Sequence, residues 1–412
     1  MYFEKLSKLL DGEKMKSAKN KKQTRIIFAS LMIVSLLLLT ISSSIQINAA
    51  YPKQRLGHRM IYDSVNDRII MYGGYIGSGE ANWVFDTWAY DYNTNEWTQL
   101  ITDDVPYGTF ASLAYDSESE KIISFGGSHA DHVPSDQTWI YDYTENTWTQ
   151  VLPSIVPNMR ESTLMVYDSE SDVVIMFGGS LHQDSNPEAD INWRFNDTWA
   201  YDYNTNTWEN MTITTYPLNY QFVSVVYSLG SDKVIAFGGS TDRDFYDDPT
   251  GGRYHGETWS YDYNTNTWSN ITPATSPSPR IGQKMAYDSE NDLIILFGGF
   301  THLQTTEIDH ETWAYDYNTL NWTQLNPDGN LERRAYSMAY DSESEKTVIF
   351  GGNTGDAPNT FFDDTWVFDY DFNNWTKMPK PEIPEDTPMF IIPVIASLSF
   401  LALLTIIRRK SR

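Results

Sequence analysis

The stretch from Arg280 to Leu325 contains the pattern that decides the fold. It reads, in order, Arg280, Tyr287-Asp288-Ser289, Leu293-Ile294-Ile295-Leu296-Phe297, Gly298-Gly299, Thr312-Trp313-Ala314-Tyr315-Asp316-Tyr317-Asn318 and Trp322. The same unit occurs six times with a period of 52 to 60 residues. A repeat of this length is typical of propeller blades.

Three spacings are constant across the six copies. Each copy has a glycine pair: Gly73-Gly74, Gly126-Gly127, Gly178-Gly179, Gly238-Gly239, Gly298-Gly299 and Gly351-Gly352. A tyrosine stands eleven positions before the first glycine, and a Thr-Trp pair follows the second. A further tryptophan comes nine residues after the first one: Trp97, Trp148, Trp208, Trp268, Trp322 and Trp375. Such regular tryptophans indicate a core between blades, because binding sites rarely repeat six times.

Each copy predicts four short strands separated by Asp-Ser and Asn-Thr turns. A single four-stranded sheet cannot bury both of its faces, so six sheets are expected to pack radially. The sequence therefore predicts an all-β, six-bladed β-propeller over residues 51–380. The predicted blades are 51–103, 104–156, 157–216, 217–277, 278–329 and 330–380. Since the first blade starts with its own first strand, every blade is expected to be complete, with blade one packing against blade six.

The glycine pair, the following tyrosine and the tryptophan seven residues after that tyrosine (Tyr315 to Trp322) resemble the kelch repeat. The resemblance covers about residues 51–380 and implies a six-bladed kelch propeller. It includes the kelch domains of secreted oxidases such as galactose oxidase. Kelch propellers serve as binding modules, scaffolds and some enzymes, so the fold leaves the function open.

The composition narrows the possible partners. The 412-residue chain has a formal net charge of −26 and no cysteine. Its negative field repels nucleic acid phosphates, so no nucleic acid partner is expected. Without cysteine, the chain has neither disulfides nor the Tyr-Cys crosslink that the oxidase resemblance would imply for copper chemistry.

Both ends of the chain predict a membrane topology. Residues 1–50 combine a basic N-terminus with an apolar run, 26–41, which is typical of a signal peptide or a signal anchor. Residues 381–387 form a short Pro-rich acidic stalk, 388–407 are long and apolar enough for a transmembrane helix, and 408–412 are a basic cytoplasmic tail. The alternative for the C-terminal segment is a sorting signal that is cleaved. The expectation is a single-pass protein of the cell membrane with an extracytoplasmic propeller.

Five Asn-x-Ser/Thr sequons agree with such an exterior location and are candidate glycosylation sites: Asn196, Asn210, Asn270, Asn321 and Asn374. Asparagine and threonine are also common in turns, so unmodified sequons remain an alternative.

The loops that vary between copies should lie together on one face, while the near-identical turns lie on the other. Between Gly-Gly and Thr-Trp the loops have 12, 10, 18, 18, 12 and 12 residues. Variable loops on a rigid scaffold commonly carry function, and the longest belong to blades three and four. An arginine stands seven residues before the tyrosine of four blades, near the expected channel mouth: Arg55, Arg160, Arg280 and Arg333. These arginines are candidates to bind a carboxylate, and internal ion pairs are the alternative.

Histidines and aromatic residues are further candidates in the loops. His182 and His255 are candidate ligand contacts, and Trp83 and Trp193 are the tryptophans outside the repeat. The alternative role for these tryptophans is to cap blade edges. His129-x-x-His132 and Asp242-x-Asp244 resemble fragments of metal sites, but no complete motif is present, so no cofactor is expected and a divalent cation such as calcium stays open.

The leading hypothesis is a membrane-anchored binding or adhesion module that recognises a protein, peptide or glycan through its loop face. The alternatives are an extracellular carbohydrate-active enzyme and a structural component of the cell envelope. A catalytic role is disfavoured because the sequence shows no catalytic motif.

Overall fold

The computed structural model describes residues 51–77, 82–106, 108–128, 133–181, 193–213, 222–241, 254–301, 310–329, 331–354 and 360–380. The predicted signal segment, the stalk and the C-terminal apolar helix lie outside the described residues. Among the residues that are described, no helix is long and apolar enough to span a membrane.

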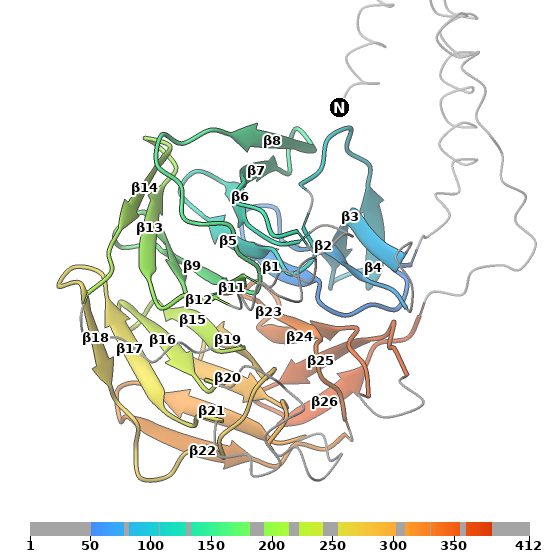
Figure 1. Ribbon diagram of the computed structural model, residues 1–412. Coiled ribbons are helices and arrows are strands. Elements are labelled where there is room, and N and C mark those ends of the chain that lie inside the picture. Colours follow the sequence, from blue (N-terminus) through green and yellow to red (C-terminus); the bar gives the residue numbers. More distant parts are fainter. Residues whose placement is uncertain are drawn as a thin grey trace, which may run out of the picture. The chain divides into compact units, whose positions relative to one another are not determined.

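Six four-stranded antiparallel sheets form a ring around an axis, as Figure 1 shows. In the first three blades the strands are β1 (Arg59–Asp63), β2 (Arg68–Tyr75), β3 (Trp83–Asp91), β4 (Glu96–Leu100), β5 (Ser112–Asp116), β6 (Lys121–Phe125), β7 (Thr138–Asp142), β8 (Thr147–Val151), β9 (Leu164–Asp168), β10 (Val173–Phe177), β13 (Thr198–Asp202) and β14 (Thr207–Asn210). In the last three they are β15 (Ser224–Ser228), β16 (Lys233–Phe237), β17 (Thr258–Asp262), β18 (Thr267–Asn270), β19 (Lys284–Asp288), β20 (Leu293–Phe297), β21 (Thr312–Asp316), β22 (Asn321–Leu325), β23 (Ser337–Asp341), β24 (Lys346–Phe350), β25 (Thr365–Asp369) and β26 (Asn374–Lys377). The prediction of an all-β, six-bladed propeller is confirmed.

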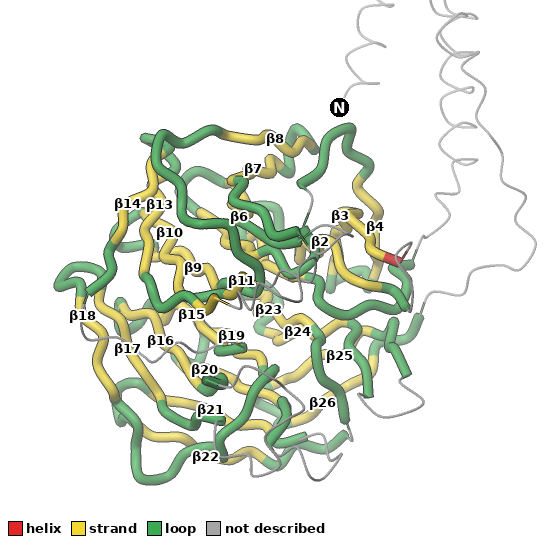
Figure 2. Tube along the Cα trace, viewed as in Figure 1, coloured by secondary structure: helices red, strands yellow, loops and turns green. Residues whose placement is uncertain are grey.

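A small two-stranded extension belongs to the third blade. It pairs β11 (Ser180–Leu181) with β12 (Trp193–Arg194) between β10 and β13. In Figure 2 the strands form the body of the ring and connecting segments cross the face toward the viewer.

The burial pattern of each blade follows from its apolar sequence. In blade five, β20 (LIILF) is buried at four of its five positions, as expected for a strand with neighbours on both faces. The outermost strand, β22, buries Trp322 between exposed residues on either side. This gradient from a fully apolar strand to an alternating one places the second strand inside the blade stack and the fourth at the rim.

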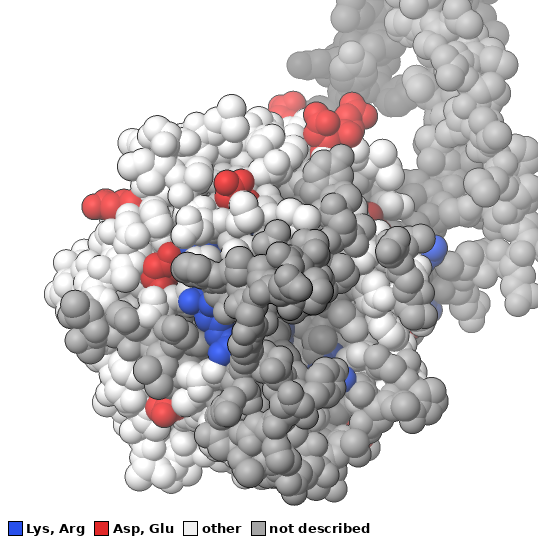
Figure 3. Space-filling view, viewed as in Figure 1, with Lys and Arg blue, Asp and Glu red and all other residues white. Residues whose placement is uncertain are grey.

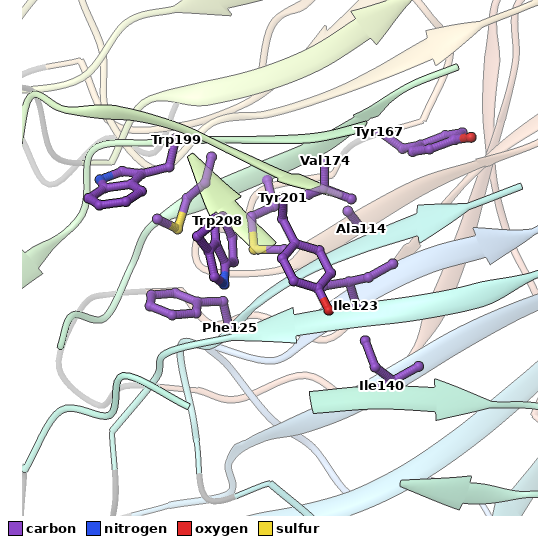
Figure 4. Close-up of a cluster of buried hydrophobic side chains, with 11 residues drawn as sticks. Ala114, Ile123, Phe125, Ile140, Tyr167, Val174, Trp199, Tyr201 and Trp208 are labelled. Atoms are coloured by element: carbon purple, nitrogen blue, oxygen red, sulfur yellow. The ribbon is translucent and has the colours of Figure 1, made fainter. Parts of the chain in front are cut away.

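Hydrophobic clusters lie between successive blades. One cluster joins Ile123 and Phe125 of blade two to Val174, Tyr201 and Trp208 of blade three. Figure 4 shows the ring of Trp208 close to that of Phe125, and their centroids are 5.1 Å apart. The core is therefore divided into six interfaces, each made by two blades.

A ring of hydrogen bonds connects all six blades through the second tryptophan of each repeat. Its indole Nε1 donates to the buried threonine that directly precedes the first tryptophan in the third strand of the preceding blade, at 2.9 to 3.1 Å. The pairs are Trp97–Thr365, Trp148–Thr87, Trp208–Thr138, Trp268–Thr198, Trp322–Thr258 and Trp375–Thr312. A threonine at this place has no function visible from one blade alone, because its partner belongs to the next blade.

Blade one closes on blade six by the same contacts that join the other blades. Trp97 packs against Phe350, with centroids 4.9 Å apart, and donates to Thr365. The Met60 amide donates to the hydroxyl of Ser337 at 2.8 Å. Neither blade borrows a strand, so the prediction of six complete blades is confirmed.

Backbone hydrogen bonds connect neighbouring blades where the chain enters the innermost strands. Gly57 N donates to Ala335 O at 3.2 Å, Phe110 N to Gly57 O at 3.3 Å, and Ser162 N to Phe110 O at 3.0 Å. The residue at this position has a positive φ in all six blades. The six residues are Gly57, Phe110, Ser162, Phe222, Gly282 and Ala335. A positive φ costs more conformational free energy at a phenylalanine than at a glycine. The left-handed turn directs the chain around the axis.

Candidate functional site

The four repeat arginines are buried within the ring. Their side chains are at most 2% exposed. Each one pairs with the acid two residues before the first tryptophan of its own blade, in the pairs Arg55–Asp86, Arg160–Asp197, Arg280–Glu311 and Arg333–Asp364, at 2.6 to 2.8 Å. This differs from the expectation of arginines that bind a ligand, because each guanidinium group is engaged by a carboxylate and by the carbonyl of the first glycine of the pair. The internal ion pair, which the sequence left open, is what the structure contains.

Arg333 illustrates the role of these pairs. Its Nη1 donates both to Asp364 at 2.8 Å and to the carbonyl of Gly351 at 2.9 Å, and Trp366 Nε1 donates to the same carboxylate at 3.0 Å. Burial by itself raises the pKa of Asp364, but the hydrogen bond and charge of Arg333 outweigh it and hold that pKa well below its usual range. The ion pair fixes the glycine pair to the third strand.

The glycine pair brings neighbouring blades together. All twelve glycines have positive φ. The Gly352 amide donates to the carbonyl of Arg55, in the next blade, at 2.8 Å. A Cβ on Gly351 would lie 2.6 Å from that same carbonyl oxygen, which leaves no room for a side chain.

Of the two blades without the arginine, blade two also lacks the acid, whereas blade four keeps it. In blade two, Gly108 stands at the arginine position and neutral Gln137 at the acid position, where it still accepts from Trp139 at 2.9 Å. In blade four, Glu257 lies 3.3 Å from the Nδ1 atom of His255. Burial, opposed by the charge of Glu257, lowers the pKa of His255 below 6.5. His255 therefore has a partner within its blade, and its other ring nitrogen lies 3.1 Å from Thr241 Oγ1.

Trp83 packs beside Phe110, which lies where the chain enters the innermost strand of blade two. Its ring is half-buried and packs against Tyr75 and Phe110, with centroids 5.5 and 6.3 Å apart. Trp193 pairs through its backbone with Leu181 in the extension of blade three. Both tryptophans thus begin a strand after the variable loop, as their equivalent sequence positions indicated.

Several predicted loop residues lie outside the described residues. They are His182, the histidines of His129-x-x-His132 and the aspartates of Asp242-x-Asp244. Within the described ranges, no group of three or more His, Asp or Glu side chains is arranged to hold a metal ion.

The sequons lie mainly on the outermost strands. Asn210, Asn270 and Asn321 are exposed on β14, β18 and β22, Asn374 is half-buried on β26, and Asn196 precedes β13. Glycosylation stays a prediction at these positions.

An axial cavity of about 420 Å³ opens where the chain enters the innermost strands. Residues from all six blades line it, among them Leu56, Phe110, Leu164, Phe222 and Ile281. This differs from the expectation of a site mostly in blades three and four, whose long loops lie largely outside the described residues. The cavity forms because the six left-handed turns leave the axis open at this level.

Three basic side chains line the cavity: Arg59, Lys284 and Arg334. Arg59 and Lys284 occupy the position three residues before the blade tyrosine, and the other blades have Ser112, Leu164, Ser224 and Ser337 there. Figure 3 shows a group of basic side chains near the middle of the face in view, beside the place of β12 and β15, with most acidic ones farther out. These cavity residues were not among the candidates that the repeat pattern indicated, although an alignment of the six repeats at this one position shows two cations among neutral residues.

The fold and the axial opening define a kelch-type six-bladed propeller. The chain matches the family described as the Attractin/LZTR1 beta-propeller over residues 122–396, more than half of its length, and it belongs to that family.

Two curated relatives resemble the chain more distantly. Mei4-dependent protein 6 of Schizosaccharomyces pombe is 22% identical over 334 residues, which cover 74% of this chain and 46% of the relative. The mouse (Mus musculus) Rab9 effector protein with kelch motifs is 28% identical over 202 residues, which cover 48% of this chain and 47% of the relative. The chain thus spans about half the length of the curated relatives it matches.

Proposed function

We propose that this chain is a protein-binding module that holds its partner on the loop face, around the mouth of the axial cavity. The observation that carries the proposal is the cavity itself, which all six blades line and which opens on the side of the variable loops. Propellers of this family type commonly bind proteins, and one relative is named as an effector of another protein.

The size of the cavity favours a partner that inserts a short segment. A volume of about 420 Å³ accommodates one or two side chains, whereas a folded domain can contact only the surrounding rim. Aromatic residues at that rim supply apolar contact area, since Trp83, Tyr75 and Phe361 lie near one another. Such aromatic anchors carry much of the free energy of binding in protein interfaces.

The test is site-specific photo-crosslinking of the full chain in its own cells. A photoreactive phenylalanine analogue replaces Leu56 at the cavity, and in a matched variant it replaces Phe372, which is 82% exposed on a turn of the opposite face. The proposal expects crosslinks to a defined protein from position 56 and none to that protein from position 372. Crosslinks of equal yield from both positions, or only from position 372, would contradict it.

We also propose that the propeller is displayed outside the cytoplasmic membrane on a C-terminal tether. The support is the sequence alone: the apolar run 388–407, the basic residues 408–412 and the N-terminal signal-like segment. Alkaline extraction of membranes should leave the full chain in the pellet and release a chain that ends at residue 380. Protease added to intact cells should digest the propeller, and protection from protease would contradict the exterior location.

A further inference from the structure

Two cations face the axial cavity without any counter-charge in the described structure. Arg59 begins β1 and Lys284 begins β19, so both side chains project from the innermost strands of blades one and five. Blade six lies between these two blades in the ring and places Ser337 at the equivalent position. The two cations therefore belong to one side of the cavity.

Neither side chain has a hydrogen-bond or ion-pair partner among the described residues. This separates them from the other basic side chains of the propeller body, of which ten form ion pairs within 4.0 Å: Arg55, Arg68, Lys121, Arg160, Lys233, Arg280, Arg333, Lys346, Lys377 and Lys380. In a chain of net charge −26, acids are abundant, yet within the described ranges none lies within ion-pair distance of Arg59 or Lys284.

The surroundings make the two charges costly. Burial, and then the charge of Arg59, lowers the pKa of Lys284 to about 7, and burial lowers the pKa of Arg59 to about 10. The other titratable groups on this side are Arg334, whose guanidinium lies 5.6 Å from the ring centroid of Phe300, and His58, which burial and neighbouring cations keep neutral. None of these groups offsets the positive charge.

One acid at an equivalent repeat position belongs to another blade and is already engaged. Glu161 holds the position equivalent to Arg334 in blade three and accepts from the hydroxyl of Ser128 at 2.5 Å. It is not among the residues that line the cavity. The rest of the wall is mainly apolar, with Leu56, Phe110 and Phe222 among its residues.

We propose that the axial cavity binds a carboxylate carried on an apolar group, with Arg59 and Lys284 as the residues that hold the charge. The guanidinium group of Arg59 can donate two hydrogen bonds to one carboxylate, and the ammonium group of Lys284 adds a second positive charge. The apolar wall accommodates the group that bears the carboxylate. That this carboxylate belongs to a partner protein, as an acidic side chain or a C-terminus, rests on the proposed function; the anion site itself does not. The strongly negative body disfavours a polyanion such as a nucleic acid.

The experiment titrates the purified full chain with phenylacetate, with its neutral analogue phenylacetamide and with inorganic phosphate, by calorimetry. Phenylacetate should bind roughly tenfold or more tightly than phenylacetamide, because charge-assisted hydrogen bonds form only with the carboxylate. Binding should be weaker at pH 8 than at pH 6, and at pH 8 it should take up a proton, seen as a heat that depends on the buffer, since the anion favours the charged form of Lys284.

Matched variants locate the binding. Lys284→Gln and Arg59→Gln should each weaken phenylacetate binding by roughly tenfold, while Lys346→Gln, which loses a surface pair with Asp369, should leave it unchanged. Thermal unfolding of each variant checks the fold, and Lys284→Gln is expected to be at least as stable as the wild type because it removes a half-buried charge that has no ion-pair partner within the described ranges. Lys284→Gln therefore reports on the site without loss of structure.

Three results would overturn the assignment: equal affinity for phenylacetate and phenylacetamide, unchanged affinity in both cavity variants, or phosphate binding at least as tight as phenylacetate. Each of them leaves the crosslinking result from position 56 standing, so failure of the anion site is distinguishable from failure of the binding module. Conversely, tight phenylacetate binding without any crosslinked protein supports the carboxylate site and assigns it to a small molecule.

Discussion

The rim of the propeller and the wall of its axial cavity are built from the same six repeats. The repeat residues are constant at the rim, but they vary at the wall. At the rim, every blade has the second tryptophan, and every one of these indoles donates to a threonine of the preceding blade. At the cavity wall, the position three residues before the blade tyrosine changes from blade to blade, and two of the six residues are cations without a partner in the described part of the chain. Uniformity at the rim is a requirement of stacking, because each interface must match the next. Arg59, Leu164 and Lys284 line the cavity, so variation at these positions does not disturb the packing of one blade on the next. Ser337, at the same repeat position, instead accepts from the Met60 amide of the neighbouring blade.

This difference means that a departure from the repeat has two physical origins in this molecule. Some departures are local substitutions with a matching change nearby, as at Gly108 and Gln137. Others, such as Arg59 and Lys284, have no compensating partner in the described structure, and they mark the candidate site. The following predictions separate the two kinds, beginning with the largest expected effect.

Breaking a buried ion pair of the repeat should be the most damaging change. Arg333→Gln leaves Asp364 buried, with its remaining cation, Lys377, on the exposed side, and should lower the free energy of unfolding by about 3–5 kcal/mol. Urea denaturation followed by tryptophan fluorescence measures this. The control is Lys380→Gln, which removes an exposed pair with Asp363 and should cost less than about 1 kcal/mol. Equal losses in the two variants would show that the repeat arginines are not structural.

The second prediction concerns the unpaired lysine of the cavity wall. Its pKa is about 7 in the folded protein against 10.5 for an ordinary lysine, so between these values the unfolded chain binds more protons and stability rises with pH. One such group contributes a slope of up to about 1.4 kcal/mol per pH unit. Lys284→Met should remove this contribution between pH 7 and 9 and increase stability most at pH 6, whereas Lys346→Met should keep the slope. A wild-type curve whose slope is unaltered by Lys284→Met would place the lysine outside the desolvated wall.

The third prediction isolates the hydrogen bond between blades. Trp322→Phe keeps an aromatic ring but leaves the buried hydroxyl of Thr258 without its donor, for a cost of about 1–2 kcal/mol. A double-mutant cycle with Thr258→Val measures the coupling, and the double variant should lose less than the sum of the two single losses. Additive losses would mean that the indole acts only by filling space.

The smallest effect is expected where one repeat carries an unfavourable residue at a turn. Leu320 has a φ of 50°, at the place where blades one to four have an asparagine that accepts from the tyrosine hydroxyl of the third strand. In blade five the buried hydroxyl of Tyr315 has no partner among the described residues. Leu320→Asn should relieve both defects and stabilise the protein by about 1 kcal/mol, since asparagine tolerates left-handed backbone.

The reverse change in a regular blade is the control for that turn. Asn266→Leu should destabilise blade four by a similar amount, because it removes the acceptor of Tyr261. Thermal melting measures both variants, and a stabilised Asn266→Leu protein would contradict the explanation.

Much of the fold was predictable because the interactions that define a blade recur at constant spacing. The apolar run before each glycine pair identifies the second strand, and the tryptophan nine residues after the first one identifies the fourth. The ring of indole–threonine bonds was not predictable in the same way, since each bond joins residues 61 to 70 positions apart, or 268 where the ring closes.

The candidate site was predicted less well, for a related reason. The repeat arginines looked like ligand-binding groups because their spacing places them near the axis, but whether a side chain at the axis points into the cavity or between strands depends on the path of the backbone, which in blade five passes through a left-handed turn at Gly282. Arg280 points into its blade and meets Glu311, while Lys284, four residues later, faces the opening. Only the packed ring distinguishes the two.

The sequence by itself determined the number of blades, the order of strands within each and the identity of the tryptophans that fill the interfaces, because these depend on local patterns repeated six times. Tertiary structure alone decided which charges are paired. An arginine and an acid about 31 residues apart become partners only when the third strand folds back on the second, and a lysine becomes isolated only when six blades close around it. Charge pairing is a property of the space around a side chain, and that space is created by the assembled ring.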